Sequence, residues 1–464
     1  MNAWFARNLL YRPAALLRGE PTFRLLRRYR VSQWWEPEEL AAYQSAALAR
    51  LLHYAVRRVP YYRDFAASAE FSSQNLCAED LSRFPVITKA ELVQAGKRLL
   101  AWRPPGTTSW KTTGGSTGVP VRLRKNRYAT AAEQAASWRC YEWYGIRPGD
   151  RAARFWGTPQ STRTRLRYRA IDAVLNRARF SAFAFQESDL AHYFERLSQD
   201  PPVWVYGYVS MLTQFARYCL EEKQPLAALG VQAVVTTSEV LSESDRDLLR
   251  KAFGAPVYNE YGCGEVGAVL YECERGSLHL MAENLFVELF PDPTPEEPAG
   301  VRLVVTDLHN RALPLLRYDL ADRAVPAPPC ACGRALPAFS RIFGRAYDFV
   351  VCSDGTRYHG EFFLYALEAA RDRGLAFEQA QFVQLEPDLL KLRIVPAPGY
   401  RLEHGRWIAE RIQAKSGGRV LVRVEETEAI ERERSGKIRL IVALPRPQAT
   451  TSSHSEATGR NSEA

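Results

Sequence analysis

Short runs of β-branched residues alternate with helical segments along the middle of the chain, and this alternation constrains the fold most. Residues 231–236 and 301–306 are apolar and short enough to be buried strands. Residues 243–252, which lie between them, have a helical pattern. Alternating strands and helices predict an α/β body in which helices cover a sheet. Before this region, residues 40–56 carry apolar side chains at helical spacing, and the first hundred or so residues are expected to be mostly helical.

The pattern changes after Phe343. Helices are predicted over residues 361–373 and 402–415, and strands over residues 381–386, 389–395, 420–424 and 437–444. This makes a compact α+β unit of about a hundred residues, a normal size for a small domain. We therefore predict a large, multi-layered N-terminal α/β domain over residues 1–343 and a small α+β C-terminal domain over residues 344–445. The polar tail, residues 446–464, cannot bury apolar surface and is expected to be disordered.

The length and composition suit a cytoplasmic protein of two to three domains. The chain has 464 residues, and no stretch approaches the ~18 consecutive apolar residues that a membrane-spanning helix needs. Arginines interrupt every apolar run in the first 19 residues, so the continuous core of a secretory signal is absent there. The eight cysteines are then expected to be free thiols, catalytic residues or metal ligands, not disulfides.

The net charge of +10 is concentrated in residues 18–30 and 163–179. Such a balance suits a polyanionic ligand, nucleic acid or an anionic membrane, although a solvated arginine-rich surface is the more ordinary explanation. Residues 4–30 are compatible with a basic amphipathic helix that contacts a membrane surface. No RNA-binding or helix-turn-helix signature is visible, so we expect no nucleic-acid partner. Nothing in the sequence indicates an oligomeric state.

A glycine-rich segment is the first chemical signal, and its residues are Thr112, Thr113, Gly114, Gly115, Ser116, Thr117 and Gly118. Three glycines let the backbone approach an anion and point N–H groups at it, and the hydroxyls add neutral donors. It is not a Walker loop, because no Gly-Lys-Ser/Thr follows. An ordinary surface loop can have the same composition, so this segment alone does not decide between the two.

Four further motifs follow in order. Residues 260–265, Glu-Tyr-Gly-Cys-Gly-Glu, place the carboxylate of Glu265 beside a tight glycine turn, where it can hold Mg²⁺ against phosphate oxygens. The next motif combines Thr-Asp-Leu at residues 306–308 with the stretch 314–322. Phe343-Gly344-Arg345 and the glycine turn at residues 434–439, which carries Lys437, complete the set.

The order and spacing of these motifs resemble the adenylate-forming superfamily of acyl-CoA synthetases, peptide-synthetase adenylation domains and luciferases. Pro60-Tyr61-Tyr62, the Pro-Leu-Leu-Arg-Tyr run and Ser-Gly-Lys-Ile-Arg are similar to the phenylacetate-CoA ligase and CapK-like branch. The resemblance covers roughly residues 60–444. It implies a large N-terminal domain and a mobile small domain joined near Gly344-Arg345. It also implies ATP-dependent activation of a carboxylic acid to acyl-AMP with release of pyrophosphate, followed by transfer to CoA.

The same resemblance assigns residue roles. It implies Lys437, Glu265 and Arg345 as catalytic residues, with Glu265 as the Mg²⁺ ligand and Lys437 on the carboxylate and α-phosphate. Asp322 would bind the ribose hydroxyls, and Ser238 and Glu239 would lie against adenine. The implied ATP and AMP contacts are Thr112, Thr113, Gly114, Gly115, Ser116, Thr117, Gly118, Ser238, Glu239, Tyr261, Gly262, Asp322 and Arg345.

The sequence departs from the family pattern at several positions. Gly264 stands where threonine is usual, Val121 where lysine is common, and Tyr347 at the hinge where Asp or Lys is usual. Residues 352–360 also differ from the segment that lines the thiol tunnel in CoA-using members. We therefore expect adenylation to be easier to detect than thioester formation.

Two alternatives to a CoA ligase stay open. One passes the acyl group to an amine, a hydroxyl or a carrier-protein thiol, as in polysaccharide or secondary-metabolite biosynthesis. The other is a non-catalytic nucleotide-binding homologue, against which the intact Glu265, Asp322, Arg345 and Lys437 argue. The acid itself is a small carboxylic acid. Four aromatic residues are expected to line its pocket and are consistent with an aryl or apolar acid: Phe155, Trp156, Tyr206 and Tyr208.

A second constellation consists of Cys273, His279, Cys330 and Cys332. Three thiols and one imidazole make a normal structural Zn²⁺ site with tetrahedral geometry, and some members of the resembled branch carry such a tetrad. Buried free cysteines and a surface histidine are the simpler interpretation, and Cys-x-Cys is a less usual spacing than Cys-x-x-Cys. We predict a structural zinc site from these four residues.

Overall fold

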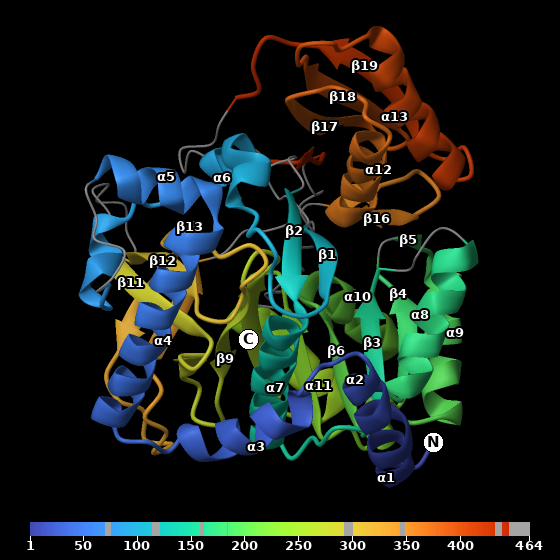
Figure 1. Cartoon of the computed structure of the whole chain (residues 1–464). Helices are drawn as coiled ribbons and strands as arrows, with labels where there is room; N and C mark the ends of the chain where they lie inside the picture. Colours follow the sequence, from blue (N-terminus) through green and yellow to red (C-terminus); the bar gives the residue numbers. More distant parts are fainter. Residues whose placement is uncertain are drawn as a thin grey trace, which may run out of the picture.

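A computed structural model describes residues 1–69, 76–113, 121–157, 162–182, 184–291, 300–343, 349–431 and 439–444. A large N-terminal α/β domain carries a smaller C-terminal α+β part on top of it in Figure 1. This arrangement confirms the predicted fold class. Among the described residues, no helix combines the length and the apolar character needed to cross a membrane.

The large domain is built on an eleven-stranded sheet with the order β11-β12-β13-β14-β10-β9-β8-β7-β6-β3-β4. Its parallel half contains β3 (Ala152–Trp156), β4 (Arg177–Ser181), β6 (Trp204–Tyr208), β7 (Ala233–Thr237) and β8 (Val257–Cys263). Its antiparallel half contains β9 (Gly267–Glu272), β10 (Leu278–Leu280), β11 (Leu285–Pro291), β12 (Val301–Asp307), β13 (Tyr318–Ala327) and β14 (Ala338–Phe343). The strands β7 and β12 lie where the β-branched runs predicted them.

Helices cover both faces of the parallel half because alternate side chains of each strand point to opposite faces. Ala233 and Val235 of β7 pack in a core cluster with α7 (Arg127–Trp143), whereas Val234 packs with α9 (Glu187–Gln199), α10 (Val209–Glu221) and α11 (Glu243–Phe253). Beyond this half, α8 (Thr162–Val174) connects β3 to β4.

The N-terminal hundred residues form helices that wrap the large sheet (Figure 1). Their bounds are α1 (Ala3–Phe5), the π-helical η1 (Ala6–Tyr11), α2 (Arg12–Leu17), α3 (Thr22–Ser32), α4 (Pro37–Arg58), α5 (Pro60–Ser68), α6 (Lys89–Ala95) and short 3₁₀ turns at Glu79–Arg83 and Gly96–Leu99. α4 ends at Arg58, and Pro60 begins α5, because proline is well tolerated in the first turn of a helix. Leucines of α4 pack against Leu303 and Val305 of β12.

The C-terminal part is a four-stranded sheet of order β19-β18-β17-β20 with two helices. Its elements are α12 (Gly360–Asp372), β17 (Gln379–Glu386), β18 (Leu389–Val395), α13 (Leu402–Lys415), β19 (Leu421–Glu426) and β20 (Ile441–Val442). The bounds of α13 and β18 are those that the sequence pattern predicts. β20 pairs parallel with β17 through Phe382 and Val383 and forms one edge of this sheet.

Two small sheets lie at the boundary between the two parts. β1 (Thr108–Thr113) and β2 (Val121–Asn126) form an antiparallel hairpin. β15 (Phe349–Val351) and β16 (Arg357–His359) form another, which pairs with β5 (Ala184–Phe185) of the large domain. The C-terminal part therefore contacts the large domain through backbone pairing of β16 with β5.

Candidate functional site

The chain order of the parallel strands reverses at one point of the sheet. From β3 the chain moves outward to β4, and it then returns to the other side of β3 as β6, followed by β7 and β8. In such open α/β sheets, ligands bind outside the carboxyl ends of the strands at the point where the strand order reverses. Here this point lies between β3 and β6, which end at Trp156 and Tyr208.

The four aromatic residues predicted for the acid pocket all lie at this switch point, but they divide into two groups. Phe155 and Tyr208 are fully buried, and Phe155 stacks on Phe180 with ring centroids 4.9 Å apart. Trp156 and Tyr206 are only partly buried. The Trp156 ring stacks on Tyr208 at 4.4 Å and on Tyr206 at 5.6 Å. Trp156 and Tyr206 are thus the two with surface left for a ligand.

A partly buried carboxylate, which no sequence pattern indicated, lies beside these aromatic rings. Glu260 of β8 accepts hydrogen bonds from the Tyr141 hydroxyl at 2.8 Å and the Tyr206 hydroxyl at 3.1 Å. Burial raises the pKa of Glu260, and the hydroxyl donors only partly oppose this shift. The Arg154 guanidinium of β3 lies over the Trp156 ring at 4.4 Å and over the Tyr206 ring at 5.3 Å, so a positive charge also contacts this aromatic group.

Two of the predicted motifs meet directly. The Tyr261 hydroxyl of β8 donates a hydrogen bond to Asp322 of β13 at 2.8 Å, across 61 residues of sequence. Gly262 follows at the point where β8 and β9 come closest. A Cβ atom there would lie 2.8 Å from the Gly267 carbonyl oxygen, so a larger residue does not fit without a backbone shift. The predicted Tyr261, Gly262 and Asp322 therefore lie at one place in the fold.

Glu265 lies in the turn between β8 and β9 and is 8% exposed. Its carboxylate is 3.8 Å from the ammonium group of Lys89, the first residue of α6. The segment before α6 is fixed by β-type pairing, in which the Asp319 amide donates to the Ile87 carbonyl at 2.9 Å. Lys89 had no sequence signal that linked it to this motif, because it is far away in the chain.

Ser238 and Glu239 directly follow the carboxyl end of β7. Ser238 has φ of 67°, a left-handed conformation that is uncommon for serine and that turns the chain sharply after the strand. The Glu239 carboxylate accepts the Ser210 amide at 2.6 Å and the Ser210 hydroxyl at 2.7 Å. It thereby caps the N-terminus of α10, where an anion is favourable. Glu239, which the resemblance places against adenine, thus also has a local structural role.

The strands that lead to the glycine-rich segment are joined to helix α7 by ion pairs. Thr112 and Thr113 end β1 in register with Arg122 and Val121. Next to them, Lys111 and the buried Lys125 of β2 contact the carboxylate of Glu133 on α7 at 3.5 and 2.8 Å. Burial alone would raise the pKa of Glu133, but the two ammonium groups outweigh it and hold the pKa at about 2.

Several predicted site residues lie outside the described part of the chain. These are Gly114, Gly115, Ser116, Thr117 and Gly118 of the glycine-rich segment, Arg345 and Tyr347 near the domain junction, and Lys437 in the last glycine turn. For Thr112 and Thr113 the structure describes only the backbone pairing.

Cys273, His279, Cys330 and Cys332 lie together, with all four ligand atoms within 4.8 Å of one another. The Cys273 and Cys330 sulfurs are 3.7 Å apart, and the Cys332 sulfur is 3.3 Å from His279 Nε2. A tetrahedral zinc ion with bonds of about 2.3 Å to sulfur and 2.0 Å to nitrogen would place its ligand atoms roughly 3.5–3.8 Å apart. His279 Nδ1 lies 3.2 Å from the Leu336 carbonyl, which fixes the ring with Nε2 directed at the thiols.

The cysteine–histidine cluster is separated from the nucleotide motifs by the length of the strands. Glu265 precedes β9 and Cys273 follows it, so the six-residue strand places them roughly 20 Å apart along its axis. The cluster joins the far ends of β9, β10 and β14, which are neighbours in the sheet. The cluster thus lies away from the loops that carry Glu265 and Asp322.

Comparison with known proteins agrees with this architecture. A family model described as the CapK C-terminal domain matches residues 363–443. The chain is 23% identical to Protein CapK of Staphylococcus aureus over 62% of this chain and 63% of that protein, so the match spans less than two thirds of CapK. It is 28% identical to the phenylacetate-coenzyme A ligase of Thermus thermophilus over 68% of this chain and 72% of that protein.

Solved structures of a 2-hydroxyisobutyryl-CoA ligase share the fold. The structure in complex with 2-HIB-AMP and CoA in the thioesterification state has a TM-score of 0.58 and 20% identity, covering 88% of this chain and 90% of that one. An open conformation of the same ligase has a TM-score of 0.54 at 20% identity, over 86% and 90% of the two chains. These structures share the fold, and the family model and the two relatives make the chain similar to CapK and phenylacetate-CoA ligase proteins, in agreement with the resemblance that its motifs carry.

Proposed function

We propose that this chain is an ATP-dependent acid–CoA ligase that forms an acyl-AMP intermediate. The observation that carries the proposal is the Tyr261–Asp322 hydrogen bond of 2.8 Å, which joins two motifs of the adenylate-forming pattern. This hydrogen bond lies near the carboxyl ends of the parallel strands, where ligands of open α/β folds bind. Tyr261 is also close in sequence to the buried Glu265.

Each described residue has a distinct part in nucleotide binding under this proposal. Asp322 accepts hydrogen bonds from the ribose hydroxyls, with the Tyr261 hydroxyl holding its carboxylate in place. The sharp turn at Ser238 presents backbone groups to adenine, because the Glu239 carboxylate is occupied at α10. Glu265 supplies a carboxylate oxygen, the type of ligand that Mg²⁺ prefers. Bound Mg²⁺ would neutralise charge on the phosphate oxygens.

The first half-reaction joins two anions, so positioning and charge neutralisation are the main demands. A carboxylate oxygen of the acid attacks the α-phosphorus of ATP, the bond to the β-phosphate oxygen breaks, and pyrophosphate leaves. We assign the phosphates to residues 112–118, and the carboxylate and α-phosphate to Lys437, with Arg345 beside the nucleotide. The partly exposed rings of Trp156 and Tyr206 favour an aromatic or otherwise apolar acid.

The second half-reaction is assigned to the face of the C-terminal part that includes residues 352–360. In this superfamily the small domain rotates, so that different faces serve the two half-reactions. The Gln186 amide of the large domain donates to Asp354 at 3.2 Å and to the Thr356 hydroxyl at 3.0 Å, which holds this segment against the large domain. In this arrangement we propose that the CoA thiol attacks the acyl carbonyl carbon and that AMP leaves.

We also propose that the cysteine–histidine cluster holds one structural zinc ion. The distances of 3.7 and 3.3 Å between ligand atoms fit a tetrahedral site, and the Leu336 carbonyl orients His279. Such an ion would cross-link strands β9, β10 and β14. Because β9 begins next to Glu265, the ion would support that part of the site from a distance.

The test is to incubate the protein with ATP, Mg²⁺ and each member of a carboxylic-acid panel, with and without CoA, and to measure AMP and acyl-CoA by mass spectrometry. CoA-dependent formation of acyl-CoA supports the proposal. Acid-dependent pyrophosphate exchange without acyl-CoA would replace CoA with an amine, a hydroxyl or a carrier-protein thiol. Nucleotide binding without exchange for any acid would indicate a non-catalytic homologue.

A further inference from the structure

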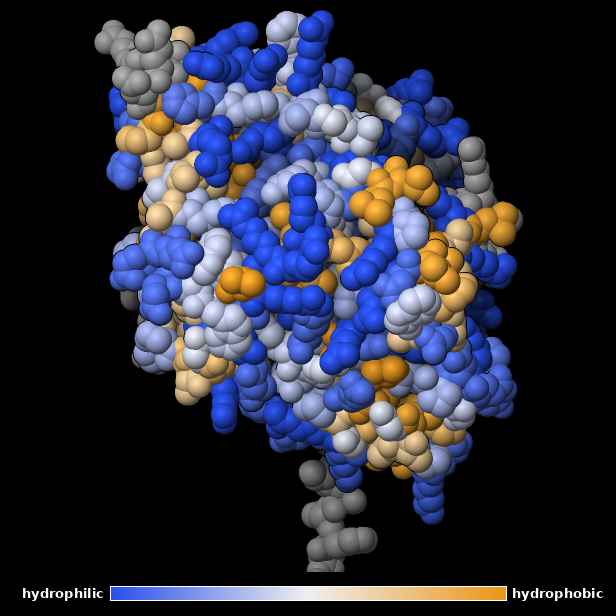
Figure 2. Space-filling view, turned by 60° about the horizontal axis from the view of Figure 1, so that its bottom comes forward, coloured by the Kyte–Doolittle hydropathy of each residue, from blue (hydrophilic) through white to orange (hydrophobic). Residues whose placement is uncertain are grey.

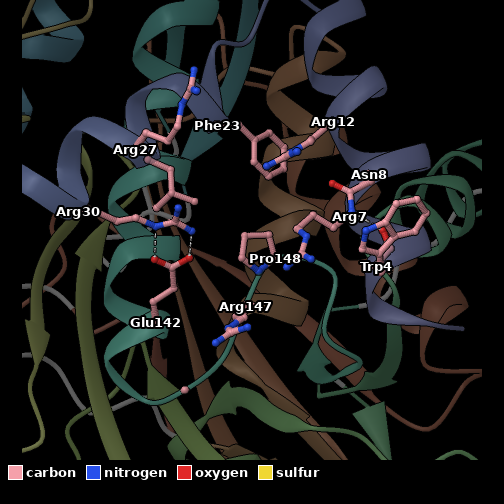
Figure 3. Close-up of a pocket in the computed structure, with 12 residues that line it drawn as sticks. Trp4, Arg7, Asn8, Arg12, Phe23, Arg27, Arg30, Glu142, Arg147 and Pro148 are labelled. Carbon is pink, nitrogen blue, oxygen red and sulfur yellow. Dashed lines mark hydrogen bonds and ion pairs between the residues drawn. The ribbon is translucent and has the colours of Figure 1, made fainter.

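The N-terminal helices enclose a cavity of about 590 Å³ that is rich in arginine (Figure 3). It lies between η1, α2 and α3 on one side and the end of α7 with the following loop on the other. Its guanidinium groups belong to Arg7, Arg12, Arg27, Arg30 and Arg147. One carboxylate, that of Glu142, lines it and pairs with Arg30, whose Nε donates to Glu142 Oε2 at 2.7 Å.

Most of the guanidinium groups that line this cavity form no ion pair within the described part of the chain, so they can bind an external anion. Within the described part of the chain, no ion pair involves Arg7, Arg27 or Arg147. Arg12 lies over the Phe23 ring, 4.9 Å from its centroid, which leaves its charge without a carboxylate. A concentration of guanidinium groups favours phosphate, which arginine binds through two parallel N–H donors.

Exposed apolar side chains occur on the same N-terminal segment. Leu16 and Leu17 are 73% and 89% exposed, and Trp4, Phe5 and Leu9 are also exposed. Figure 2, which brings the lower side of Figure 1 forward, shows hydrophobic patches next to strongly hydrophilic surface. Arginine combined with exposed Trp, Phe and Leu on one helical segment is typical of a surface that lies in a lipid headgroup layer.

The segment is held rigidly in place, so its arginines and apolar side chains are presented in fixed positions. Gly149 has φ of 95°, and a Cβ atom there would lie 2.4 Å from the Ala3 carbonyl oxygen, so the loop packs directly on α1. The Asn176 amide donates to the Met1 carbonyl at 3.0 Å and to the Gly149 carbonyl at 2.8 Å. The buried Tyr11 donates to the Gln134 side chain of α7 at 3.1 Å.

We propose that this face docks on the surface of an anionic phospholipid bilayer. The cavity arginines bind the lipid phosphates, and the exposed side chains around Trp4, Leu16 and Leu17 enter the layer between headgroups and acyl chains. A soluble phosphate compound or a nucleic acid would satisfy the arginines but would leave Leu16 and Leu17 in water. A bilayer accounts for both features, and the face is separate from the nucleotide motifs.

The test is co-sedimentation of the full chain with vesicles of phosphatidylcholine alone or mixed with phosphatidylglycerol. We expect binding only to the mixed vesicles and release at high salt, which screens charge between the protein and the lipid surface. Arg27→Ala/Arg147→Ala should weaken partitioning about thirty-fold, because each basic residue near an anionic surface contributes roughly a five-fold factor. Both arginines are exposed, so the fold should be retained, which circular dichroism checks.

Matched variants separate this face from general charge and hydrophobicity. Arg406→Ala/Arg423→Ala removes two exposed arginines from α13 and β19 and should leave binding unchanged. Leu16→Ser/Leu17→Ser should weaken binding, whereas Leu402→Ser/Leu421→Ser, which changes exposed leucines of the C-terminal part, should not.

Three results would overturn the proposal. They are absence of binding to mixed vesicles at low salt, equal losses in the test and control pairs, and unchanged binding of Leu16→Ser/Leu17→Ser. Calorimetric binding of inorganic phosphate or pyrophosphate that depends on Arg27 and Arg147, without vesicle binding, would make the cavity a soluble-anion site and would also overturn it.

Discussion

We expect Glu283→Ala to destabilise the large domain strongly, because it leaves a buried guanidinium without its carboxylate. Arg139 of α7 and Glu283 form an ion pair of 2.6 Å whose side chains are 0% and 2% exposed. The Ser32 hydroxyl of α3 also donates to Glu283 at 2.6 Å. Breaking a buried pair from one side costs about 3–5 kcal/mol, and the loss of the hydroxyl's acceptor adds roughly 1 kcal/mol. Equilibrium urea unfolding followed by circular dichroism would measure the change.

Two comparison variants make this prediction specific. Asp64→Ala breaks the Arg63 and Arg98 pairs on the surface, where Asp64 is 49% exposed, and should cost less than about 1 kcal/mol. Arg139→Met/Glu283→Leu should recover most of the stability, because apolar side chains of similar volume can replace a buried pair. If Glu283→Ala changed stability no more than Asp64→Ala, the buried pair would not be the link between α3, α7 and the turn before β11.

Three further perturbations test other parts of the structure. Glu265→Gln should lower Mg²⁺-dependent activity about a hundred-fold or more, measured as acid-dependent AMP release; a near-normal rate would remove Glu265 from the metal site. Freshly purified protein should contain about one zinc per chain by metal analysis, and Cys332→Ser should lower both zinc content and the melting temperature; zinc-free protein would end this assignment. The pKa of Glu133 falls from 4.5 to about 2 on folding, so its charge stabilises the protein above about pH 4.5 and this contribution is lost as the pH falls through 2. Glu133→Gln should therefore be most destabilising near neutral pH, and a constant difference from pH 7 to pH 2 would contradict the ion-pair assignment.

Local sequence patterns predicted the parts of the fold that depend on neighbouring residues. The helix α13 and the strand β18 have the bounds that their apolar periodicity indicates, and β12 differs by one residue from the predicted 301–306. The fold class followed from the alternation of strands and helices, and the resemblance to CapK and phenylacetate-CoA ligase proteins followed from the order of the motifs.

Features that depend on distant residues were not visible in the sequence. Lys89 contacts Glu265 because the segment before α6 pairs with the start of β13, which no local pattern reveals. Glu239 caps α10 through a turn whose geometry depends on the φ angle of Ser238. The pairing of β16 with β5 likewise depends on how the C-terminal part meets the large domain. In each case the free energy comes from a tertiary contact, and local propensity gives no information about it.

The surroundings of Glu260 likewise depend on residues that are distant in the sequence. It stands between Asn259 and Tyr261 in a recognisable motif, yet its burial and its hydrogen bonds to Tyr141 and Tyr206 come from α7 and β6. A carboxylate in a strand is usually exposed, so the sequence alone predicts a surface residue here.

The most direct test of the proposed activity is acid-dependent exchange of radiolabelled pyrophosphate into ATP. We predict that at least one acid of a panel that includes aryl and aliphatic carboxylates will drive exchange in the wild-type protein. Lys437→Ala should abolish that exchange while ATP binding, measured by calorimetry, is largely retained, because this lysine is assigned to the reacting groups and not to adenine. Wild-type protein that binds ATP but exchanges pyrophosphate with no acid, or a Lys437→Ala variant that exchanges at the wild-type rate, would contradict the account.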